Sequence, residues 1–360
     1  MSTIPEPVQG NHLRWPAEWE AQDAVWLSWP HRADLWQGGL SELTGRYADL
    51  CALIAPQAEV RINAAAALHP AIRRELEQRN VRRYRLFDHA TNDVWCRDHG
   101  AIFVQRADGG LQLADWTFNA WGGKFPPWDL DNAIPSRMAD SLKLPRLRSP
   151  FILEGGAIEG NGEGLLLTTE AVLLNPNRNP ERTRQEVEQE LARLLGTRSV
   201  FWLGQGIEGD DTDGHIDDMV RFVCPDAVVS ITEEDAHSPH YRHLAENNER
   251  LQDLRTLSGH RVEVIPLPMP RPLLAHDWRL EQLPASYANF LICNDVVIVP
   301  TFDQPREDDR ALGILRECFP GRRVAGFDAR RLVLEGGAIH CITQQQPRPG
   351  TPFTPEEEKA

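Results

Sequence analysis

The sequence predicts an α/β protein built from repeated units. Helical and strand patterns alternate along the whole chain of 360 residues. The hexapeptide Leu-Glu-Gly-Gly-Ala-Ile at 153–158 recurs unchanged at 334–339, and a shorter Gly-Ala-Ile echo lies at 100–102. Such internal identity favours one repeated supersecondary unit, although a strand and turn reused for packing alone is the alternative. We therefore expect a ring of similar units in one domain over residues 1–353, followed by a disordered tail at 354–360.

Two helices are predicted in the first 200 residues. Between Ser41 and Ala55, apolar residues recur at i, i+4, i+7, i+8 and i+11, which is the spacing of an amphipathic helix. The short run Val60–Asn63 then reads as a strand. Asn179 followed by Pro180 resembles a helix cap with proline in the first turn, and Gly196 is a stop signal after a stripe of valine and leucine. A helix from about 180 to 195 is therefore expected.

The last third repeats this order of elements. Val296–Pro300 predicts a strand, and Gln304 followed by Pro305 marks the start of a helix. The apolar run Arg331–Leu334, which leads into the second hexapeptide, is interpreted as another strand. A proline-rich connection lies at 266–272, and we find no flexible Gly/Ser linker in the interior.

Composition and charge exclude several classes of function. The formal charge of −15, from 53 acidic and 38 basic side chains, argues against binding to a nucleic-acid backbone and favours a cationic ligand. The start Met1–Glu6 has no basic and apolar signal pattern, and no apolar run approaches the roughly 18 residues that span a bilayer. We expect a cytoplasmic protein without membrane partners. Six scattered cysteines predict reduced thiols: Cys51, Cys96, Cys224, Cys293, Cys318 and Cys341.

The densest polar segment is Asp210–Asp218, which contains His215 and precedes a predicted strand at 219–223. Alternation along an extended chain would place His215 and Asp217 on the same face. A calcium loop is one alternative, but the segment lacks the central glycine and terminal glutamate of an EF-hand. A structural acidic loop is the other alternative.

Three further candidates sit beside glycines at predicted strand ends. Asp98 precedes the strand Ala101–Val104, Glu154 lies in the first hexapeptide, and Cys341 follows the second. Singly, each has a structural reading: an Arg97–Asp98 ion pair, a turn residue and a buried thiol. Together they suggest a thiol nucleophile, a histidine base and carboxylates that bind a cation with several N–H donors. A guanidinium group meets that description.

These motifs resemble those of the agmatine deiminase family, within the guanidine-modifying (pentein) superfamily. The matching segments run in the family's order over about residues 15 to 347: Trp95–Asp98, Phe118–Lys124, Leu153–Gly156, Asp211–Asp217 and Gly337–Pro347. The resemblance implies a five-bladed, pseudo-symmetric α/β propeller of repeated ββαβ units with the active site at its centre.

The resemblance also assigns roles to particular residues. It implies that Cys341 is the nucleophile, His215 the general acid and base, Glu154 the carboxylate that orients the histidine, and Asp98 and Asp217 the clamp for the guanidinium. Trp95 and Trp121 would shape the substrate channel. Strand alternation would put Trp95 and Asp98 on opposite faces, so a bend is required there. Asp210 or Asp211 could receive the terminal ammonium of agmatine.

The reaction so implied is hydrolysis of agmatine to N-carbamoylputrescine and ammonia, a step of putrescine and polyamine biosynthesis, through a covalent cysteine thiouronium. No metal or organic cofactor is required, and a homo-oligomer is possible. Peptidyl-arginine deimination, another guanidine hydrolysis and a non-enzymatic polyamine-binding protein are the alternatives. The chain differs from the residues that are usual in the family at Ala101, Glu159 and Leu334–Glu335. We expect these positions to lie near the tail of the substrate.

Overall fold

The computed structural model describes residues 13–36, 39–275 and 282–353. Within these residues the strands form five small sheets. Their members, in spatial order, are β1 (Leu13–Arg14), β5 (Ile102–Arg106), β6 (Leu111–Thr117) and β7 (Arg146–Ile152); β10 (Ser199–Leu203), β9 (Leu165–Thr169) and β8 (Ile158–Gly160); β11 (Val220–Cys224), β12 (Ala227–Thr232) and β13 (Glu263–Pro268); β14 (Leu291–Cys293), β15 (Val296–Thr301) and β16 (Arg323–Asp328); β17 (Thr343–Pro347), β2 (Gln22–Ser28), β3 (Glu59–Ala64) and β4 (Tyr84–Asp88).

Each sheet contains the same three-strand unit. Two strands pair antiparallel, and a crossover helix then returns the chain to a third strand, parallel to the second, as in β8–β9–β10 and β11–β12–β13. The crossover helices are α6 (Ile134–Leu142), α8 (Arg184–Leu195), α9 (Tyr241–Leu251), α10 (Pro305–Cys318) and α1 (Leu40–Ile54). This is the expected ββαβ unit, present five times.

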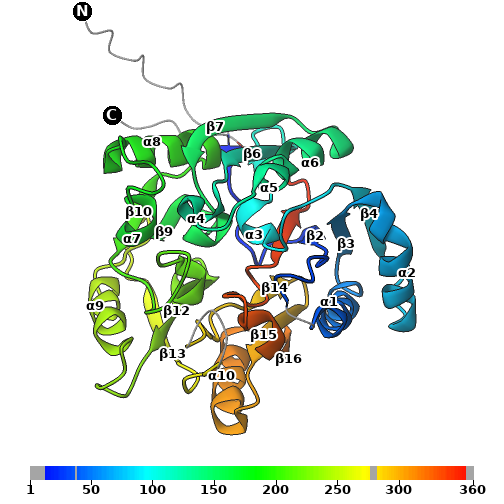
Figure 1. Cartoon of the computed structure of the whole chain (residues 1–360). Helices are drawn as coiled ribbons and strands as arrows, with labels where there is room; N and C mark the ends of the chain where they lie inside the picture. Colours follow the sequence, from blue (N-terminus) through cyan, green and yellow to red (C-terminus); the bar gives the residue numbers. More distant parts are fainter. Residues whose placement is uncertain (1–12, 37–38, 276–281, 354–360) are drawn as a thin grey trace, which may run out of the picture.

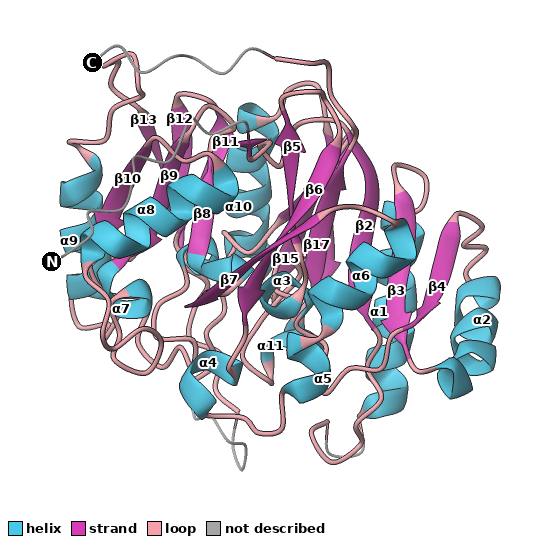
Figure 2. Cartoon of the chain, turned by 90° about the horizontal axis from the view of Figure 1, so that it is seen from above, coloured by secondary structure: helices cyan, strands magenta, loops and turns pink. Residues whose placement is uncertain are grey.

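The units are arranged as a ring. In Figure 1 the helices α1, α8, α9 and α10 lie on the outside, while the one-turn helix α3 (Cys96–His99) lies near the centre. The ring is closed by pairing β17, near the end of the chain, with β2 near its start. The short helices α4 (Ala120–Gly123), α5 (Asp129–Asn132) and α11 (Arg330–Val333) gather along the lower edge of the sheets in Figure 2.

The apolar patterns of the sequence correspond to buried surfaces. On α1, Leu43, Tyr47, Leu50 and Ile54 are fully buried, and each large side chain so removed from water contributes about 1.5–3 kcal/mol. The remaining helices are α2 (His69–Gln78) and α7 (Glu170–Leu173), with 3₁₀ turns η1 (Ala66–Leu68), η2 (Gly155–Ala157) and η3 (Ile216–Asp218). No helix among the described residues is long and apolar enough to cross a membrane.

Three sequence expectations about elements are wrong. The proline-rich segment 266–272 is not a connection throughout, because its first three residues complete strand β13 beside β12. Helix α8 begins at Arg184, not at Pro180, because Thr183 and Glu186 form a capping box at its start. Asn179 instead exchanges two hydrogen bonds with the backbone of Ile152 in β7. The run Arg331–Leu334 is not a strand: its first three residues end helix α11, which packs on α1.

The two hexapeptides differ in conformation. In the first copy the glycines form η2, and Ile158 begins strand β8. In the second copy Gly336 has a φ of 103°, and the next strand, β17, begins only at Thr343. The glycine-rich sequence therefore marks equivalent places in two units without imposing one backbone path, because glycine is free to adopt either. The expected tail at 354–360 and the start Met1–Glu6 lie outside the described residues.

Candidate active site

Five of the polar residues predicted from the sequence meet at the centre of the ring. Each lies in the segment just before the first strand of a unit, so the repeated fold brings distant parts of the chain together. The segments before β5, β8, β11, β14 and β17 contribute, in this order, Asp98, Glu154, His215 with Asp217, Asn289, and Cys341. All six side chains are buried.

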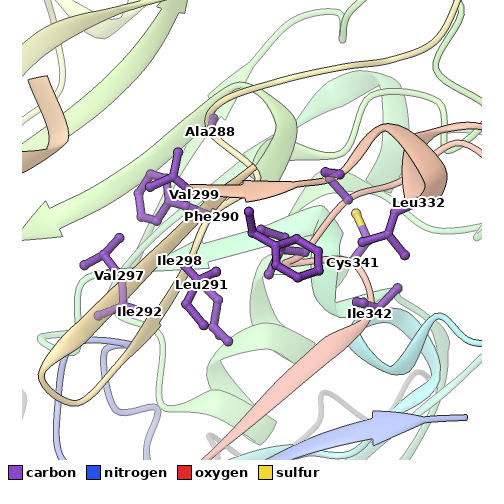
Figure 3. Packing of buried hydrophobic residues seen from close by; sticks show 14 of the residues in the cluster. Ala288, Phe290, Leu291, Ile292, Val297, Ile298, Val299, Leu332, Cys341 and Ile342 are labelled. Carbon is purple, nitrogen blue, oxygen red and sulfur yellow. The ribbon is translucent and has the colours of Figure 1, made fainter. Parts of the chain in front are cut away.

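Cys341 has an acidic and polar environment on one side. Its sulfur lies 3.0 Å from Nδ2 of Asn289 and 3.8 Å from Oδ2 of Asp217. On the other side Figure 3 shows apolar neighbours, among them Leu332 and Ile342. Burial raises the pKa of the Cys341 thiol well above its ordinary value, and the nearby aspartates raise it further.

A high pKa does not distinguish Cys341 from the other cysteines. Burial also raises the pKa of Cys51, Cys96 and Cys293 to about 12 in each case. What distinguishes Cys341 is that it lines the central cavity and faces carboxylates that attract a cationic substrate. All six cysteines are free thiols, as expected from their spacing.

His215 lies between two carboxylates. Its Nδ1 is 3.7 Å from Oδ1 of Asp98, and its Nε2 is 3.8 Å from Oε2 of Glu154. Burial alone would lower the pKa of His215, but Asp98, Glu154 and Asp217 together raise it to about 10. At neutral pH the ring is therefore an imidazolium that can donate a proton.

Glu154 is held in place by Arg178. The Nε atom of this arginine is 2.6 Å from Oε1 of Glu154, and both side chains are fully buried. The same guanidinium donates to Asp213 at 2.8 Å and to the backbone oxygen of Thr212 at 3.0 Å. Burial would raise the pKa of Glu154, but the charge of Arg178 lowers it. Arg178 thus ties the carboxylate to the loop that carries His215.

Asp98 is fixed by neighbours from two other segments. The backbone N–H of Gly156 donates to its Oδ1 at 3.0 Å, and the indole N–H of Trp121 donates to its Oδ2 at 3.0 Å. Burial raises the pKa of Asp98 to about 6, with the charges of Asp217 and Glu154 adding to the effect and His215 opposing it. The close approach needs glycine, since a Cβ at position 156 would lie 2.5 Å from Nδ1 of His215.

Asp217 is supported by a second, deeper layer of charges. His340 lies between Oδ2 of Asp217 and Oε2 of Glu18, at 2.7 Å from each. Burial would raise the pKa of Asp217, but the hydrogen bond and attraction of His340 lower it. Glu18 in turn pairs with Arg221 at 2.8 Å and with Arg97 at 3.7 Å.

Arg97 therefore has a structural partner, as the sequence suggested, although this partner is Glu18 rather than Asp98. Glu159 belongs to the same layer. Its carboxylate lies 3.0 Å from Nε of Arg221 and accepts from the backbone N–H of Phe222. The expectation that Glu159 lies near the substrate tail is not met, whereas Glu335 does line the cavity.

The cavity has a volume of about 350 Å³ and reaches from Cys341 to the edge occupied by α4 and α5. Trp95, Trp121 and Asp211 line it together with Asp98. Trp95 and Asp98 reach the same space because Trp95 caps the one-turn helix α3, so the required bend is present. Trp95 and Trp121 contact edge to face, with ring centroids 6.4 Å apart.

Asp210 lies elsewhere. Its carboxylate turns back on its own loop and accepts from the backbone N–H groups of Thr212, Gly214 and His215. It borders a separate surface cavity. Strand alternation also fails here, because His215 precedes η3 rather than a strand. His215 and Asp217 nevertheless converge, on Gly156.

Three ligand-type side chains lie close together in the described part of the chain. Atoms of Asp217, Asp218 and Cys341 are within 4.8 Å of one another. Asn289 already donates to Asp218 and Cys341, and His340 binds Asp217. We interpret the group as part of an acidic pocket for an organic cation.

Four further residues contribute to the site without being predicted from the sequence: Asn289, Arg178, His340 and Glu18. Asn289 stands before a predicted strand, as the other candidates do, and that position was the available signal. His340 adjoins the cysteine. Arg178 and Glu18 act through partners 24 and 322 positions away, Glu154 and His340, and no local pattern marks them.

Known proteins resemble the chain over nearly its full length. The pattern that defines the Porphyromonas-type peptidyl-arginine deiminase family matches residues 14–347. The chain belongs to this family. The agmatine deiminase of Ectopseudomonas mendocina is 36% identical, with 97% of this chain and 99% of the relative covered. That of Medicago truncatula is 37% identical, with 94% and 96% covered.

A solved structure of a family member supports the fold. It is described as an agmatine deiminase of Enterococcus faecalis catalysing its reaction, and it superposes with a TM-score of 0.88 at 32% identity, covering 94% of this chain and 96% of the other. The five-unit α/β propeller of the pentein superfamily is therefore the architecture of this family member.

Proposed function

We propose that this protein hydrolyses agmatine to N-carbamoylputrescine and ammonia, with Cys341 as the nucleophile. The observation that carries the proposal is the convergence of Cys341, His215 and the carboxylates of Asp98, Asp217 and Glu154 at the base of the central cavity. Relatives that share over a third of the sequence are agmatine deiminases.

Asp98 and Asp217 bind the guanidinium of the substrate and orient its carbon towards the sulfur. In the protein alone, Oδ1 of Asp217 and Nδ1 of His215 make no hydrogen bond to the described residues. They are therefore available to partners on the substrate. The positive charge of the guanidinium offsets the aspartates that raise the pKa of Cys341, so binding favours loss of the thiol proton.

The thiolate then attacks the guanidinium carbon to form a tetrahedral adduct. His215 donates its proton to one amino group, the C–N bond breaks, and ammonia leaves a covalent thiouronium on Cys341. The neutral His215 takes a proton from water, and the resulting hydroxide adds to the same carbon. The C–S bond then breaks and the hydroxyl group loses its proton to solvent as the C=O bond forms, which releases the ureido product and the thiolate. Glu154, fixed by Arg178, keeps the imidazole in position through these steps.

The tail of agmatine extends between Trp95 and Trp121 towards the mouth, where Asp211 receives the terminal ammonium. Asp211 lines the cavity. Asp210 accepts hydrogen bonds from the backbone of its own loop. Asp210 is therefore better described as a support for the His215 loop. We place the protein among cytoplasmic enzymes, and the charge of the guanidinium itself makes a cofactor unnecessary for this reaction.

Ammonia release from agmatine, free arginine, an arginyl peptide and methylated arginine tests the proposal. We expect turnover of agmatine alone, its loss in Cys341→Ser, and retention in the control Cys318→Ser, whose thiol lies at the end of α10 away from the cavity. The family description makes peptidyl-arginine deimination the second candidate, and preference for the peptide would establish it instead. Silence on all four substrates would leave a guanidine-binding protein.

A further inference from the structure

A second group of polar side chains lies between two units of the ring, and the residues that line the central cavity are others. His89 follows β4, and Ser141 lies in the last turn of α6, in the neighbouring unit (Figure 1). Nε2 of His89 is 2.8 Å from Oγ of Ser141, and Nδ1 is 2.9 Å from Oδ1 of Asn63 in β3. His89 and Asn63 are buried, whereas Ser141 is exposed. A serine, a histidine and an asparagine are therefore joined in one line from the surface to the interior.

The amide of Asn63 fixes which nitrogen of His89 carries the proton. Nδ2 of Asn63 faces the hydroxyl of Ser28 at 3.4 Å and the sulfur of Cys96 at 3.8 Å. Its Oδ1 therefore faces His89 as an acceptor, and Nδ1 of the ring donates to it. Nε2 then carries a lone pair, so in the hydrogen bond with Ser141 the hydroxyl is the donor.

The ring of His89 is neutral at ordinary pH and can accept a proton. Burial lowers the pKa of His89 to about 4, the charge of Arg137 lowers it further, and the charges of Asp88 and Asp140 oppose this. An imidazolium formed here lies at the C-terminal end of α6, where the helix dipole favours a positive charge. The base is therefore weak, but it is present in its active form and its protonated form is stabilised.

We propose that Ser141 is a second nucleophile of this protein, activated by His89, whose tautomer Asn63 fixes, and that it takes acyl groups from small activated carboxylic esters. A nucleophile, a base and a group that orients the base form the arrangement that serves acyl transfer in unrelated folds. The alternative is that the three side chains only hold two units together, a role that does not require the hydroxyl to be exposed.

The tautomer determines the course of the reaction. The oxygen of Ser141 adds to the ester carbonyl while its proton passes to Nε2 of His89. The adduct collapses, the C–O bond to the leaving alcohol breaks, and the proton passes from Nε2 to that alcohol. Water then adds to the acyl group and gives a proton to Nε2. Collapse of this second adduct releases the acid, and the proton returns to Oγ of Ser141.

The expected acceleration is modest. Because Ser141 is exposed, solvent surrounds the oxyanion of each adduct, and the general base is the main contribution. Such a base contributes about 10²–10⁴-fold, and a pKa of about 4 places His89 at the lower end of that range.

Labelling with a fluorophosphonate, which loses fluoride to an activated serine, tests the nucleophile, and mass spectrometry identifies the site. Cys341→Ser serves as the parent, so that the thiol in the central cavity does not react. We expect Ser141 to be labelled about 100-fold faster than Ser258. Ser258 is the internal control, because it is also exposed and 3.2 Å from a histidine, but that ring, of His260, is itself exposed.

The dependence of labelling on pH distinguishes the two kinds of hydroxyl. Between about pH 6 and pH 8 the rate at Ser141 should hardly change, because His89 is already deprotonated throughout. A hydroxyl without a base reacts as its alkoxide, so its rate rises about tenfold per pH unit.

Two variants separate activation from packing. His89→Gln keeps an amide between Asn63 and Ser141 but has no basic nitrogen, so labelling of Ser141 should fall about 100-fold. Ser141→Ala should abolish the share of p-nitrophenyl acetate hydrolysis that His89→Gln also loses. In the chain with Cys341 intact, Ser141→Ala should turn over agmatine as fast as the parent, so the outcome is independent of the function proposed for the central cavity.

Thermal unfolding shows whether His89→Gln is folded. If it is not, the comparison with Ser258 and the pH profile of the parent decide the question. Labelling of Ser141 within about threefold of Ser258, or a rate that rises about tenfold per pH unit, would overturn the proposal and leave the three side chains as a structural contact.

Discussion

At the scale of single residues, the site depends on charges that are buried in pairs. Glu154 and Arg178 are both inaccessible to solvent and 2.6 Å apart. Removing one member of such a pair leaves an uncompensated charge in the interior, which costs about 3–5 kcal/mol. The pair also determines where the carboxylate stands relative to His215.

We therefore expect Arg178→Met to lower the free energy of unfolding by about 3 kcal/mol or more and to reduce kcat strongly. Urea unfolding measures the first effect and ammonia release the second. In the control, Arg178→Met combined with Glu154→Gln should recover much of the stability but not the activity. A single variant as stable as the parent would show that the pair has no such role.

The raised pKa of Asp98 predicts how activity depends on pH. Burial raises it to about 6, so the carboxylate is charged above that pH and becomes neutral below it. A neutral Asp98 attracts the guanidinium less. We expect kcat/KM for agmatine to fall as the pH drops through about 6, and Asp98→Asn to be weak at every pH without that step. A kcat/KM that is constant from about pH 7 to pH 5 would contradict the assignment.

At the scale of elements, the same six residues have two conformations because their surroundings differ. In the first copy, Gly156 lets the backbone approach His215 and Asp98, and its N–H binds Asp98. In the second copy, a Cβ at Gly337 would lie 2.3 Å from the ring of Trp95. In both copies glycine admits a neighbouring side chain that belongs to the site.

Gly156→Ala should consequently abolish most activity, since its Cβ would displace His215 or Asp98. Gly313→Ala is the matched control: position 313 lies within α10, and a Cβ there meets nothing within 4 Å. In a helix interior this change stabilises by about 0.5–1 kcal/mol. Ammonia release should be largely lost in Gly156→Ala and kept in Gly313→Ala. Thermal unfolding should show that Gly313→Ala is the more stable variant. Full activity in Gly156→Ala would mean that the approach is not needed.

At the scale of the whole molecule, the site is complete only when all five units are in place. Each unit contributes the residue before its first strand, and β17 must pair with β2 near the start of the chain to close the ring. Glu18, which precedes β2, reaches His340 beside the nucleophile. The pairing that closes the ring therefore also brings Glu18 to the active site.

The sequence predicted what depends on local patterns. Helix α1 and the strands around Val60–Asn63 and Val296–Pro300 follow from apolar spacing. The sequence predicts too early a start for α8, because Asn179 resembles a helix cap but accepts a hydrogen bond from the backbone of β7. Arg331–Leu334 was misread because a short apolar run suits a strand or a buried helix equally.

The residues of the candidate site could likewise be predicted only where a local motif marks them. Cys341, His215, Glu154, Asp98 and Asp217 stand in motifs and do converge, although their roles remain proposals. Arg178 binds Glu154 in its own unit and Asp213 in the next unit, and Glu18 binds His340 where the ring closes. No local pattern of the sequence marks these contacts. Asn289 is intermediate: its position before a strand was visible, but an amide is uninformative until its neighbours are known.

The central claim is that chemistry proceeds through a covalent bond to Cys341. The most direct measurement is mass spectrometry of the protein quenched with acid during turnover of agmatine. We expect the peptide that contains Cys341 to gain the mass of agmatine less ammonia, and this gain to be absent in Cys341→Ser. Turnover without an adduct on any peptide, or with an adduct on another cysteine, would contradict the account.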